Sequence, residues 1–434
     1  MSAEEPPRDA NSAPSGGSAA AQPQAWGGHT SVEEAPRDAN SAPLGGSAAA
    51  QPEAWGDRSS APLAVRALTA HVFRHPLRTP VVTSFGTMRD RPMVLVRAED
   101  ADGVAGWGEA WCNFPAVGAE HRARLVESVL APLVTGRAFR DPSEAFDALT
   151  AQTAVLALQS GEPGPFAQAI AGVDIALWDL SARRAGEPLW RMLGGRSPAI
   201  RVYASGLNPD EPSRLAEAKR DEGFRAFKLK VGFGPERDLA NLRALRGALG
   251  AECALMTDAN QAWTLDAAID MARRLEAFDV DWLEEPLRAD RPWAEWQALR
   301  SATRIPLAAG ENIAGDAPFD AAIAAGALAV LQPDIAKWGG FSRNVPLARR
   351  VLAAGRRFCP HYLGGGVGLL ASAHWLAAVG GDGMLEIDAN PNPLRSATCG
   401  PLVSITEGCA SLDDTPGLGI EPDLAALARY AIGT

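Results

Sequence analysis

Cysteine is scarce in this chain, and its spacing does not indicate a metal site. The 434 residues contain five cysteines, and no Cys-x-x-Cys pair occurs among them. An odd number of thiols without such a pair argues against a zinc site and against a disulfide framework. We therefore expect a reducing, cytoplasmic compartment. Cys359 stands two residues before His361, and we interpret it as a packed core thiol rather than a nucleophile.

Positive charge and long apolar runs are lacking as well. The formal net charge is −11 at pH 7, whereas nucleic acids and anionic membranes both prefer a basic face, so we expect neither as a partner. No apolar run reaches the ~18 residues that a membrane-spanning helix needs. The N-terminus lacks the basic and apolar regions of a secretory signal. The length is sufficient for two domains with their own cores.

The first 60 residues lack the apolar periodicity of a folded domain. They are rich in Ala, Gly, Pro and Ser, and residues 4–27 recur as residues 33–56 with all but three positions identical. Two such copies cannot stack into a core as the units of a repeat protein do. We predict that residues 1–60 form a disordered, duplicated tail with no part in catalysis.

The next segment has a mixed pattern of strands and helices. Alternating or apolar runs at 64–73, 93–98 and 104–109 indicate strands, and helical spacing follows at 120–135 and 165–185. We predict an α+β capping domain over residues 61–195. The turn-rich C-terminal segment, residues 391–434, is expected to return and complete it.

Short apolar runs that end in a polar residue recur between residues 196 and 390. The separations between successive markers are 28, 26, 27, 23 and 27 residues for Lys230, Asp258, Glu284, Glu311, Asp334 and His361. Each separation accommodates one strand and one helix, and eight such strands can be assigned. The pattern therefore predicts an α/β fold with a TIM-type barrel. The active site of such a barrel lies at the carboxyl ends of its strands.

Three of the markers are carboxylates on successive strands. Asp258, Glu284 and Glu311 would repel one another unless a hard cation lay between them, and oxygen ligands suit Mg²⁺ or Mn²⁺ rather than zinc. A single acidic strand end is more often a helix cap, but three at regular spacing favour a metal site. Glu285 follows Glu284 directly, so strand alternation predicts the opposite face for it.

Two lysines share one face of a predicted strand. Lys228 and Lys230 are two residues apart, so both point into the barrel if Phe227 and Leu229 face the helices. Burial and a neighbouring like charge both lower the pKa of a lysine, and that is how a lysine becomes a base near neutral pH. The alternative is a solvated strand end.

A histidine and an aspartate follow the sixth and seventh predicted strands. An aspartate that accepts a hydrogen bond from one imidazole nitrogen orients the other nitrogen towards the substrate. We predict this relation for Asp334 and His361. By contrast, His374 lies in an apolar helical run and is interpreted as a core residue.

Together these motifs resemble the mandelate racemase/muconate lactonizing enzyme family of the enolase superfamily. The resemblance covers roughly residues 63–430. It rests on Lys228-x-Lys230, Asp258-x-Asn260, Glu284-Glu285-Pro286, Gly310-Glu311-Asn312, Asp334 with Lys337-x-Gly339-Gly340, and His361. The resemblance implies a (β/α)₇β barrel with a capping domain built from both chain ends. It also implies Mg²⁺ and a carboxylate substrate that loses its α-proton.

One position indicates the branch of the family. The muconate lactonizing type carries a lysine at the end of the sixth strand, where this chain has Asp334. The chain is thus similar to the mandelate racemase type, with Lys230 on one face of the substrate and the His361–Asp334 dyad on the other. The resemblance also implies that Asn260 and Glu386 bind the substrate.

The function expected from these residues is abstraction of an α-proton through an enediolate. Dehydration of an acid sugar or a similar hydroxy acid is the first hypothesis. A racemase, an epimerase or a lactone cycloisomerase uses the same residues and is the alternative. A catalytically silent barrel is a third hypothesis, against which the complete set of residues argues. We expect a small carboxylate as the partner, and a homo-oligomer.

Overall fold

The computed structural model describes residues 62–82 and 86–432. The tail predicted for residues 1–60 lies outside the described residues. No helix in the described part of the chain is both long and apolar enough to cross a membrane.

The capping domain is organised around an antiparallel sheet of four strands in the order β3-β2-β1-β4. The strands are β1 (Leu63–Val82), β2 (Thr87–Asp100), β3 (Ala105–Ala110) and β4 (Ala138–Phe139). Gly106 and Gly108 let the long helix α4 (Pro163–Ala185) lie directly on β3. A Cβ on Gly108 would come within 2.1 Å of the carbonyl oxygen of Gly172, so a larger residue at position 108 would push the helix away.

Further helices of the capping domain pack on the sheet or on α4. They are α1 (Gly118–Leu125), the π-helical turn η1 (Val126–Leu130), α2 (Ala131–Val134), α3 (Pro142–Ser160) and α5 (Leu189–Met192). The sequence pattern did not predict α3. This helix begins at Asp141, whose side chain accepts a hydrogen bond from the backbone N–H of Glu144 at 2.9 Å. Such an N-terminal cap stabilises a helix by about 1 kcal/mol.

The barrel contains the eight predicted parallel strands, in the sheet order β11-β10-β9-β8-β7-β6-β5-β12. β12 pairs with β5, and no backbone ladder joins β11 to β12 within the described residues. The strands are β5 (Ala199–Leu207), β6 (Ala226–Lys230), β7 (Ala254–Asp258), β8 (Leu283–Glu284), β9 (Leu307–Ala309), β10 (Val330–Leu331), β11 (Arg357–Phe358) and β12 (Leu385–Asp388).

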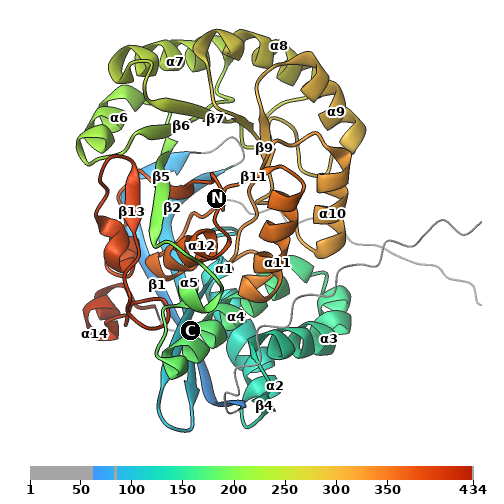
Figure 1. The fold of residues 1–434 in the computed structure, drawn as a ribbon, viewed down its shortest axis with the longest axis vertical. Helices are drawn as coiled ribbons and strands as arrows, with labels where there is room; N and C mark the ends of the chain where they lie inside the picture. The colour runs from blue at the N-terminus through green and yellow to red at the C-terminus, as the bar shows by residue number, and fades with distance from the viewer. Residues whose placement is uncertain (1–61, 83–85, 433–434) are drawn as a thin grey trace, which may run out of the picture. The chain divides into compact units, whose positions relative to one another are not determined.

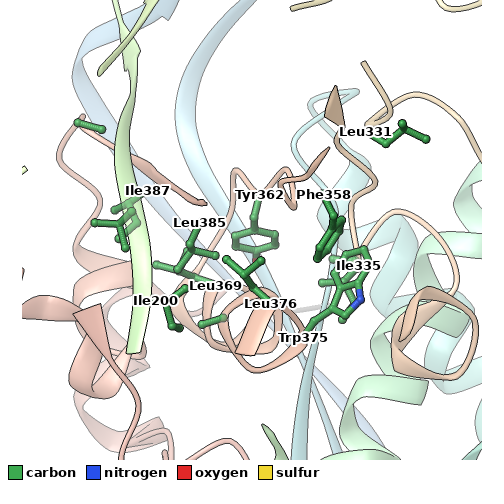
Figure 2. Packing of buried hydrophobic residues seen from close by; sticks show 14 of the residues in the cluster. Ile200, Leu331, Ile335, Phe358, Tyr362, Leu369, Trp375, Leu376, Leu385 and Ile387 are labelled. Atoms are coloured by element: carbon green, nitrogen blue, oxygen red, sulfur yellow. The ribbon is translucent and has the colours of Figure 1, made fainter. Parts of the chain in front are cut away.

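Helices surround these strands (Figure 1). They are α6 (Pro212–Asp221), α7 (Pro235–Leu249), α8 (Leu265–Leu275), continued by η2 (Glu276–Phe278), α9 (Trp293–Ala302), α10 (Asp316–Ala325), α11 (Gly340–Ala353) and α12 (Gly366–Val379). Their apolar faces pack on the sheet. In Figure 2 the rings of Phe358 and Trp375 lie against each other, with centroids 4.4 Å apart. This packing joins α12 to the strand that precedes His361.

The barrel interior below the site is closed by a separate apolar layer. Tyr203, Met256, Trp282 and Cys359 belong to it, and all four are buried. Met384 donates its backbone N–H to the sulfur of Cys359 at 3.4 Å. Burial raises the pKa of this thiol to about 11. The environment is that of the packed core thiol predicted for Cys359.

The C-terminal segment contacts both the barrel and the capping domain. It contains α13 (Pro393–Ser396), η3 (Gly400–Val403), β13 (Cys409–Ser411), α14 (Leu424–Leu427) and η4 (Ala428–Tyr430). β13 pairs antiparallel with β5 of the barrel. The backbone N–H of Ile432 donates to the carbonyl oxygen of Val72 in β1 at 3.1 Å.

Candidate active site

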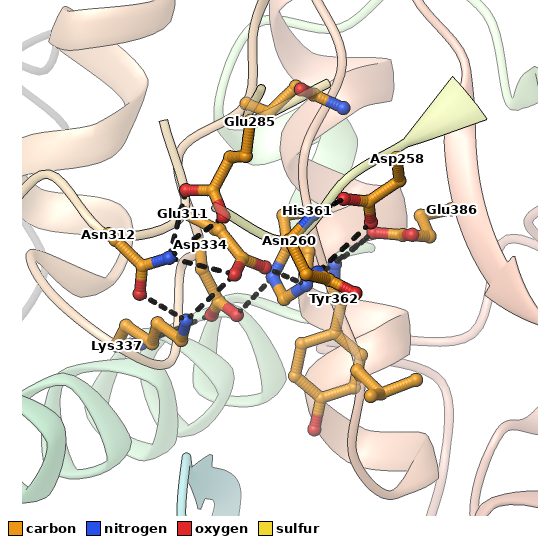
Figure 3. Close-up of polar contacts among 12 residues, drawn as sticks. Asp258, Asn260, Glu285, Glu311, Asn312, Asp334, Lys337, His361, Tyr362 and Glu386 are labelled. Carbon is orange, nitrogen blue, oxygen red and sulfur yellow. Dashed lines mark hydrogen bonds and ion pairs between the residues drawn. The ribbon is translucent and has the colours of Figure 1, made fainter. Parts of the chain in front are cut away.

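The predicted site residues gather at the carboxyl ends of the barrel strands. Figure 3 shows Glu285, Glu311 and Asn312 on one side of this group and Asp258 and Glu386 on the other, with His361 between them. All of the predicted catalytic, binding and metal-ligating side chains except Lys230 and Glu311 belong to buried residues, and these two are only slightly exposed.

Lys228 and Lys230 share the inner face of β6, as predicted. The ammonium of Lys228 is 2.6 Å from Oε1 of Glu284 and 2.7 Å from Oε1 of Glu386, and that of Lys230 is 2.5 Å from Oδ2 of Asp258. Burial lowers the pKa of both lysines, but the neighbouring carboxylates raise it more, and the net shift is upward. This direction is opposite to the expected lowering, because the carboxylates outweigh burial and the like charge.

Glu284 has a complete set of donors from the protein. Besides Lys228, it accepts hydrogen bonds from Nε1 of Trp282 at 3.2 Å and from Nε2 of Gln332 at 2.6 Å. Burial nevertheless raises its pKa to about 7. Gln332 belongs to the Gln-Pro-Asp motif at the end of β10. The sequence marks this strand end by Asp334, but it does not indicate the direction of the Gln332 side chain.

Glu285 lies on the same side as Glu311, contrary to the prediction from strand alternation. Its φ of 39° interrupts the alternation. Nδ2 of Asn312 donates to both oxygens of Glu285, at 2.8 and 3.1 Å, and to Oε1 of Glu311 at 2.9 Å. Burial and the charges of Glu311 and Asp258 raise the pKa of Glu285 well above its usual range. Glu285 thus adds a fourth carboxylate to the group.

Each predicted metal ligand is paired with a basic side chain of the chain itself. Asp258 contacts Lys230, Glu284 contacts Lys228, and Glu311 contacts Nε2 of His361. Among the described residues no three His, Cys, Asp or Glu side chains already converge as a metal cage would. A divalent cation would compete with these three basic groups for the carboxylates.

The donor set nevertheless suits Mg²⁺ or Mn²⁺. Asp258, Glu284, Glu285 and Glu311 offer only oxygen, which hard cations prefer. Within the described part of the chain, Glu285 has Asn312 as its hydrogen-bond donor and forms no ion pair. A buried carboxylate beside two others is costly without a cation. The residues present therefore fit a divalent metal.

His361 and Asp334 form the predicted pair. Nδ1 of His361 is 2.8 Å from Oδ2 of Asp334, whose Oδ1 accepts hydrogen bonds from the backbone N–H groups of Ala336 and Lys337 at 2.8 and 3.1 Å. Burial lowers the pKa of His361, but Glu311, Glu386 and Asp334 raise it well above its usual range. The three carboxylates around the imidazole thus favour its protonated form.

Asn260 and Glu386 are the two predicted substrate ligands. Asn260 donates its backbone N–H to Oδ1 of Asp258 at 2.8 Å and its amide to Oδ2 at 3.3 Å. Glu386 accepts from Ser205 Oγ at 2.5 Å and from the backbone N–H of Tyr362 at 3.1 Å. Ser205 was not predicted from the sequence, because no distinguishing motif surrounds it.

The comparisons with known proteins agree with this geometry. Residues 212–426 match the family Enolase C-terminal domain-like. Residues 67–194 match the family Mandelate racemase / muconate lactonizing enzyme, N-terminal domain. The chain belongs to the mandelate racemase/muconate lactonizing enzyme family of the enolase superfamily. The predicted family and fold class are thereby confirmed.

Relatives with curated names support the enzymatic class. The chain is 34% identical over 385 residues to D-galactarolactone cycloisomerase of Agrobacterium fabrum. This match covers 85% of this chain and 99% of the relative. Other relatives are named as dehydratases, a racemase and synthases. The chain is therefore an enzyme of this superfamily, a lyase or an isomerase.

Solved structures show the same fold. A mandelate racemase/muconate lactonizing enzyme from Bordetella bronchiseptica is 59% identical, with a TM-score of 0.81, and the match covers 85% of this chain and all of that one. A racemase from Streptomyces coelicolor A3(2), crystallised with bound magnesium, is 31% identical with a TM-score of 0.77 and the same coverage.

Proposed function

We propose that this enzyme catalyses a β-elimination from an acid sugar. The base removes the proton on the carbon next to the carboxylate, a C=C bond forms, and the C–O bond at the β carbon breaks. The resulting enol then becomes a 2-keto acid. A single observation supports this proposal: Lys230 and the His361–Asp334 dyad, to which we assign proton transfer, lie on opposite sides of the strands that carry the carboxylates.

The sheet order supports this division. Lys230 ends β6, and the dyad follows β10 and β11, while β7, β8 and β9 between them carry Asp258, Glu284 and Glu311. The deprotonated form of one group can therefore accept the α-proton, while the other group acts at a different face. An imidazolium such as His361 can donate a proton to a departing hydroxyl group.

We also propose that Asp258, Glu284 and Glu311 hold Mg²⁺ or Mn²⁺, with Glu285 adding negative charge beside them. The cation, when bound, neutralises the negative charge that develops on the substrate carboxylate. Magnesium in the racemase structure from S. coelicolor supports this assignment. Lys228, held between Glu284 and Glu386, adds positive charge at the same place.

Dehydration and cycloisomerisation differ only in the leaving oxygen. If a β-hydroxyl leaves, the product is a dehydrated keto acid. If the β oxygen belongs to a ring, the ring opens and no water is lost. Dehydration is our first proposal, and the similarity to D-galactarolactone cycloisomerase supports ring opening as the second candidate. Both candidates require the same two proton-transfer groups.

Mass spectrometry of the product separates the candidates. We would incubate the enzyme and Mg²⁺ in D₂O with a panel of open-chain acid sugars and their lactones, then measure α-proton exchange and 2-keto product. After correction for the deuterium that the carbon skeleton takes up from D₂O, keto product that has lost one oxygen as water supports dehydration, and keto product that keeps every oxygen of the substrate supports cycloisomerisation. Exchange without keto product would support racemisation instead. Neither exchange nor product across the panel would contradict the proposed function. Light scattering of the same preparation tests the expected homo-oligomer.

A further inference from the structure

Two buried carboxylates of the capping domain lie at the starts of two barrel helices. Glu109, at the end of β3, accepts hydrogen bonds from the backbone N–H groups of Gly365 at 2.5 Å and Gly368 at 2.9 Å. Asp174, in α4, accepts from the backbone N–H of Ser342 at 3.1 Å and from its hydroxyl at 2.5 Å. The side chains thus reach from one domain to the N-termini of α12 and α11 in the other.

These two helices are the ones that follow the dyad. α11 begins six residues after Asp334, and α12 begins five residues after His361. β3 packs against α12, and α4 packs against α11. The capping domain therefore contacts the loop after Asp334 and the loop after His361 at the ends where α11 and α12 begin.

The contact at Glu109 extends to the residue after His361. The hydroxyl group of Tyr362 forms a hydrogen bond with the Glu109 carboxylate. A Cβ on Gly365 would come within 2.7 Å of Oε1 of Glu109, so the carboxylate and the loop are in close contact. The loop carrying His361 is thus bonded to Glu109 at Tyr362, Gly365 and Gly368.

The residues after Glu109 contact the same two loops. Nδ2 of Asn113 donates to the carbonyl oxygen of Leu363 at 2.5 Å. The backbone N–H of Trp111 donates to the carbonyl oxygen of Ala336, two residues after Asp334, at 3.3 Å. The segment 109–113 therefore bridges the His361 loop and the Asp334 loop.

A carboxylate with a purely structural role need not contact the loops that carry Asp334 and His361. Asp179 provides the contrast. It is equally buried and lies in the same domain, but it accepts from the backbone N–H groups of Trp107 at 2.7 Å and Leu418 at 2.6 Å and pairs with Arg183. None of these partners belongs to a dyad loop.

We propose that Glu109, supported by Asp174, is a positioning residue that sets the placement of the His361 imidazole relative to Asp334 and the substrate. The proposal rests on the proposed function for the role of His361. The backbone N–H groups of a helix N-terminus favour a carboxylate as their acceptor, while burial raises the pKa of both side chains. Proton transfer is sensitive to this placement, because a shift of about 1 Å can lower a rate ~100-fold.

The test compares Glu109→Gln with the matched control Asp179→Asn in the Mg²⁺-loaded enzyme. The probes are galactarate and L-talarate, which are epimers at one α carbon and so present that proton to opposite faces. His361→Asn identifies the epimer whose exchange in D₂O depends on His361. We expect Glu109→Gln to lower exchange of that epimer at least about tenfold, with KM and exchange of the other epimer within about twofold. Asp179→Asn should lower Tm without changing the ratio of the exchange rates of the two epimers.

A second measurement does not depend on turnover. The imidazole N–H signals of His361, assigned by their loss in His361→Asn, are compared by NMR in each variant. We expect Glu109→Gln to shift them, Tyr362→Phe to shift them less, and Asp179→Asn to leave them in place. Unchanged signals in a folded Glu109→Gln enzyme, or an equal shift in Asp179→Asn, would overturn the positioning role. If the wild-type enzyme shows no α-proton exchange but Glu109→Gln still shifts the His361 signals, the result would count against the proposed function alone.

Discussion

Nδ1 of His361 lies 2.8 Å from Oδ2 of Asp334, and the second oxygen of Asp334 is fixed by two backbone N–H groups. This relation orients the imidazole so that Nε2 faces Glu311 at the centre of the site. Because Asp334 cannot rotate without losing both backbone hydrogen bonds, the direction of Nε2 is set before a substrate arrives.

Substitution of the two proton-transfer groups should separate their roles. We expect His361→Asn to reduce keto-acid formation by roughly 10²–10⁴-fold, the usual contribution of a general acid or base. Slow α-proton exchange by Lys230 should remain. Lys230→Ala should have the converse effect if His361 removes the proton. Exchange is followed by NMR in D₂O beside product formation.

Asp334→Asn should behave as a weakened His361 variant. The amide keeps the shape of the carboxylate but loses the charge that stabilises the imidazolium. We expect a loss of product formation on the order of 10²-fold. The pKa read from the pH–rate profile should also move down, towards the usual value of histidine. A full rate with an unchanged profile would remove Asp334 from the mechanism.

The metal assignment predicts how strongly each carboxylate contributes to the affinity for Mg²⁺. Asp258→Asn, Glu284→Gln and Glu311→Gln should each weaken Mg²⁺ binding by more than ~100-fold, because even the loss of an outer partner costs about 10–100-fold. Glu285→Gln should cost less, since it supplies charge beside the site. Titration calorimetry on EDTA-treated protein measures both. A larger loss of Mg²⁺ affinity in Glu285→Gln than in Glu284→Gln would make Glu285 the ligand and Glu284 the neighbouring charge. Full activity of the EDTA-treated enzyme without added metal would exclude a metal.

Local patterns predicted the barrel well and part of the capping domain poorly. The patterns of residues 254–258 and 307–309 predict strands with these bounds, and β7 and β9 have them, because each is a short apolar run that ends at a turn. The missed helix α3 buries Ala145, Leu149, Thr153 and Ala157 at every fourth position. Mostly small side chains on this face produce little contrast with the exposed face, so the helical period is weak.

The residues that gather in the candidate site could be predicted from the sequence, but the pairs that they form could not. Polar residues at strand ends indicated Lys230, Asp258 and His361 correctly as neighbours of one site. The direction of Glu285 depends on a positive φ, which strand alternation cannot reveal. Glu109 joins the site only through docking of one domain on the other, and no local pattern carries that information.

The buried imidazole of His374 should make the fold sensitive to acid. Nδ1 of His374 accepts the backbone N–H of Trp190 at 2.9 Å, and burial lowers its pKa from 6.5 to about 3. The unfolded chain therefore takes up a proton below pH 6.5, whereas the folded chain does not until about pH 3. The stability that neutral His374 allows is complete above pH 6.5 and is lost as the pH falls.

Between pH 7 and pH 5 this difference amounts to about 2 kcal/mol, from ~1.4 kcal/mol per pKa unit. His374→Asn keeps an acceptor for Trp190 but cannot titrate. The free energy of unfolding of this variant should therefore lack the pH-dependent component, whether the variant is more or less stable than the wild type. Urea unfolding of both proteins at pH 5, 6 and 7 measures the effect. Buried acids such as Asp174, whose pKa burial raises to about 7, contribute equally to both proteins and cancel in the comparison. Stability curves that stay parallel from pH 7 to pH 5 would mean that His374 is already charged in the folded protein.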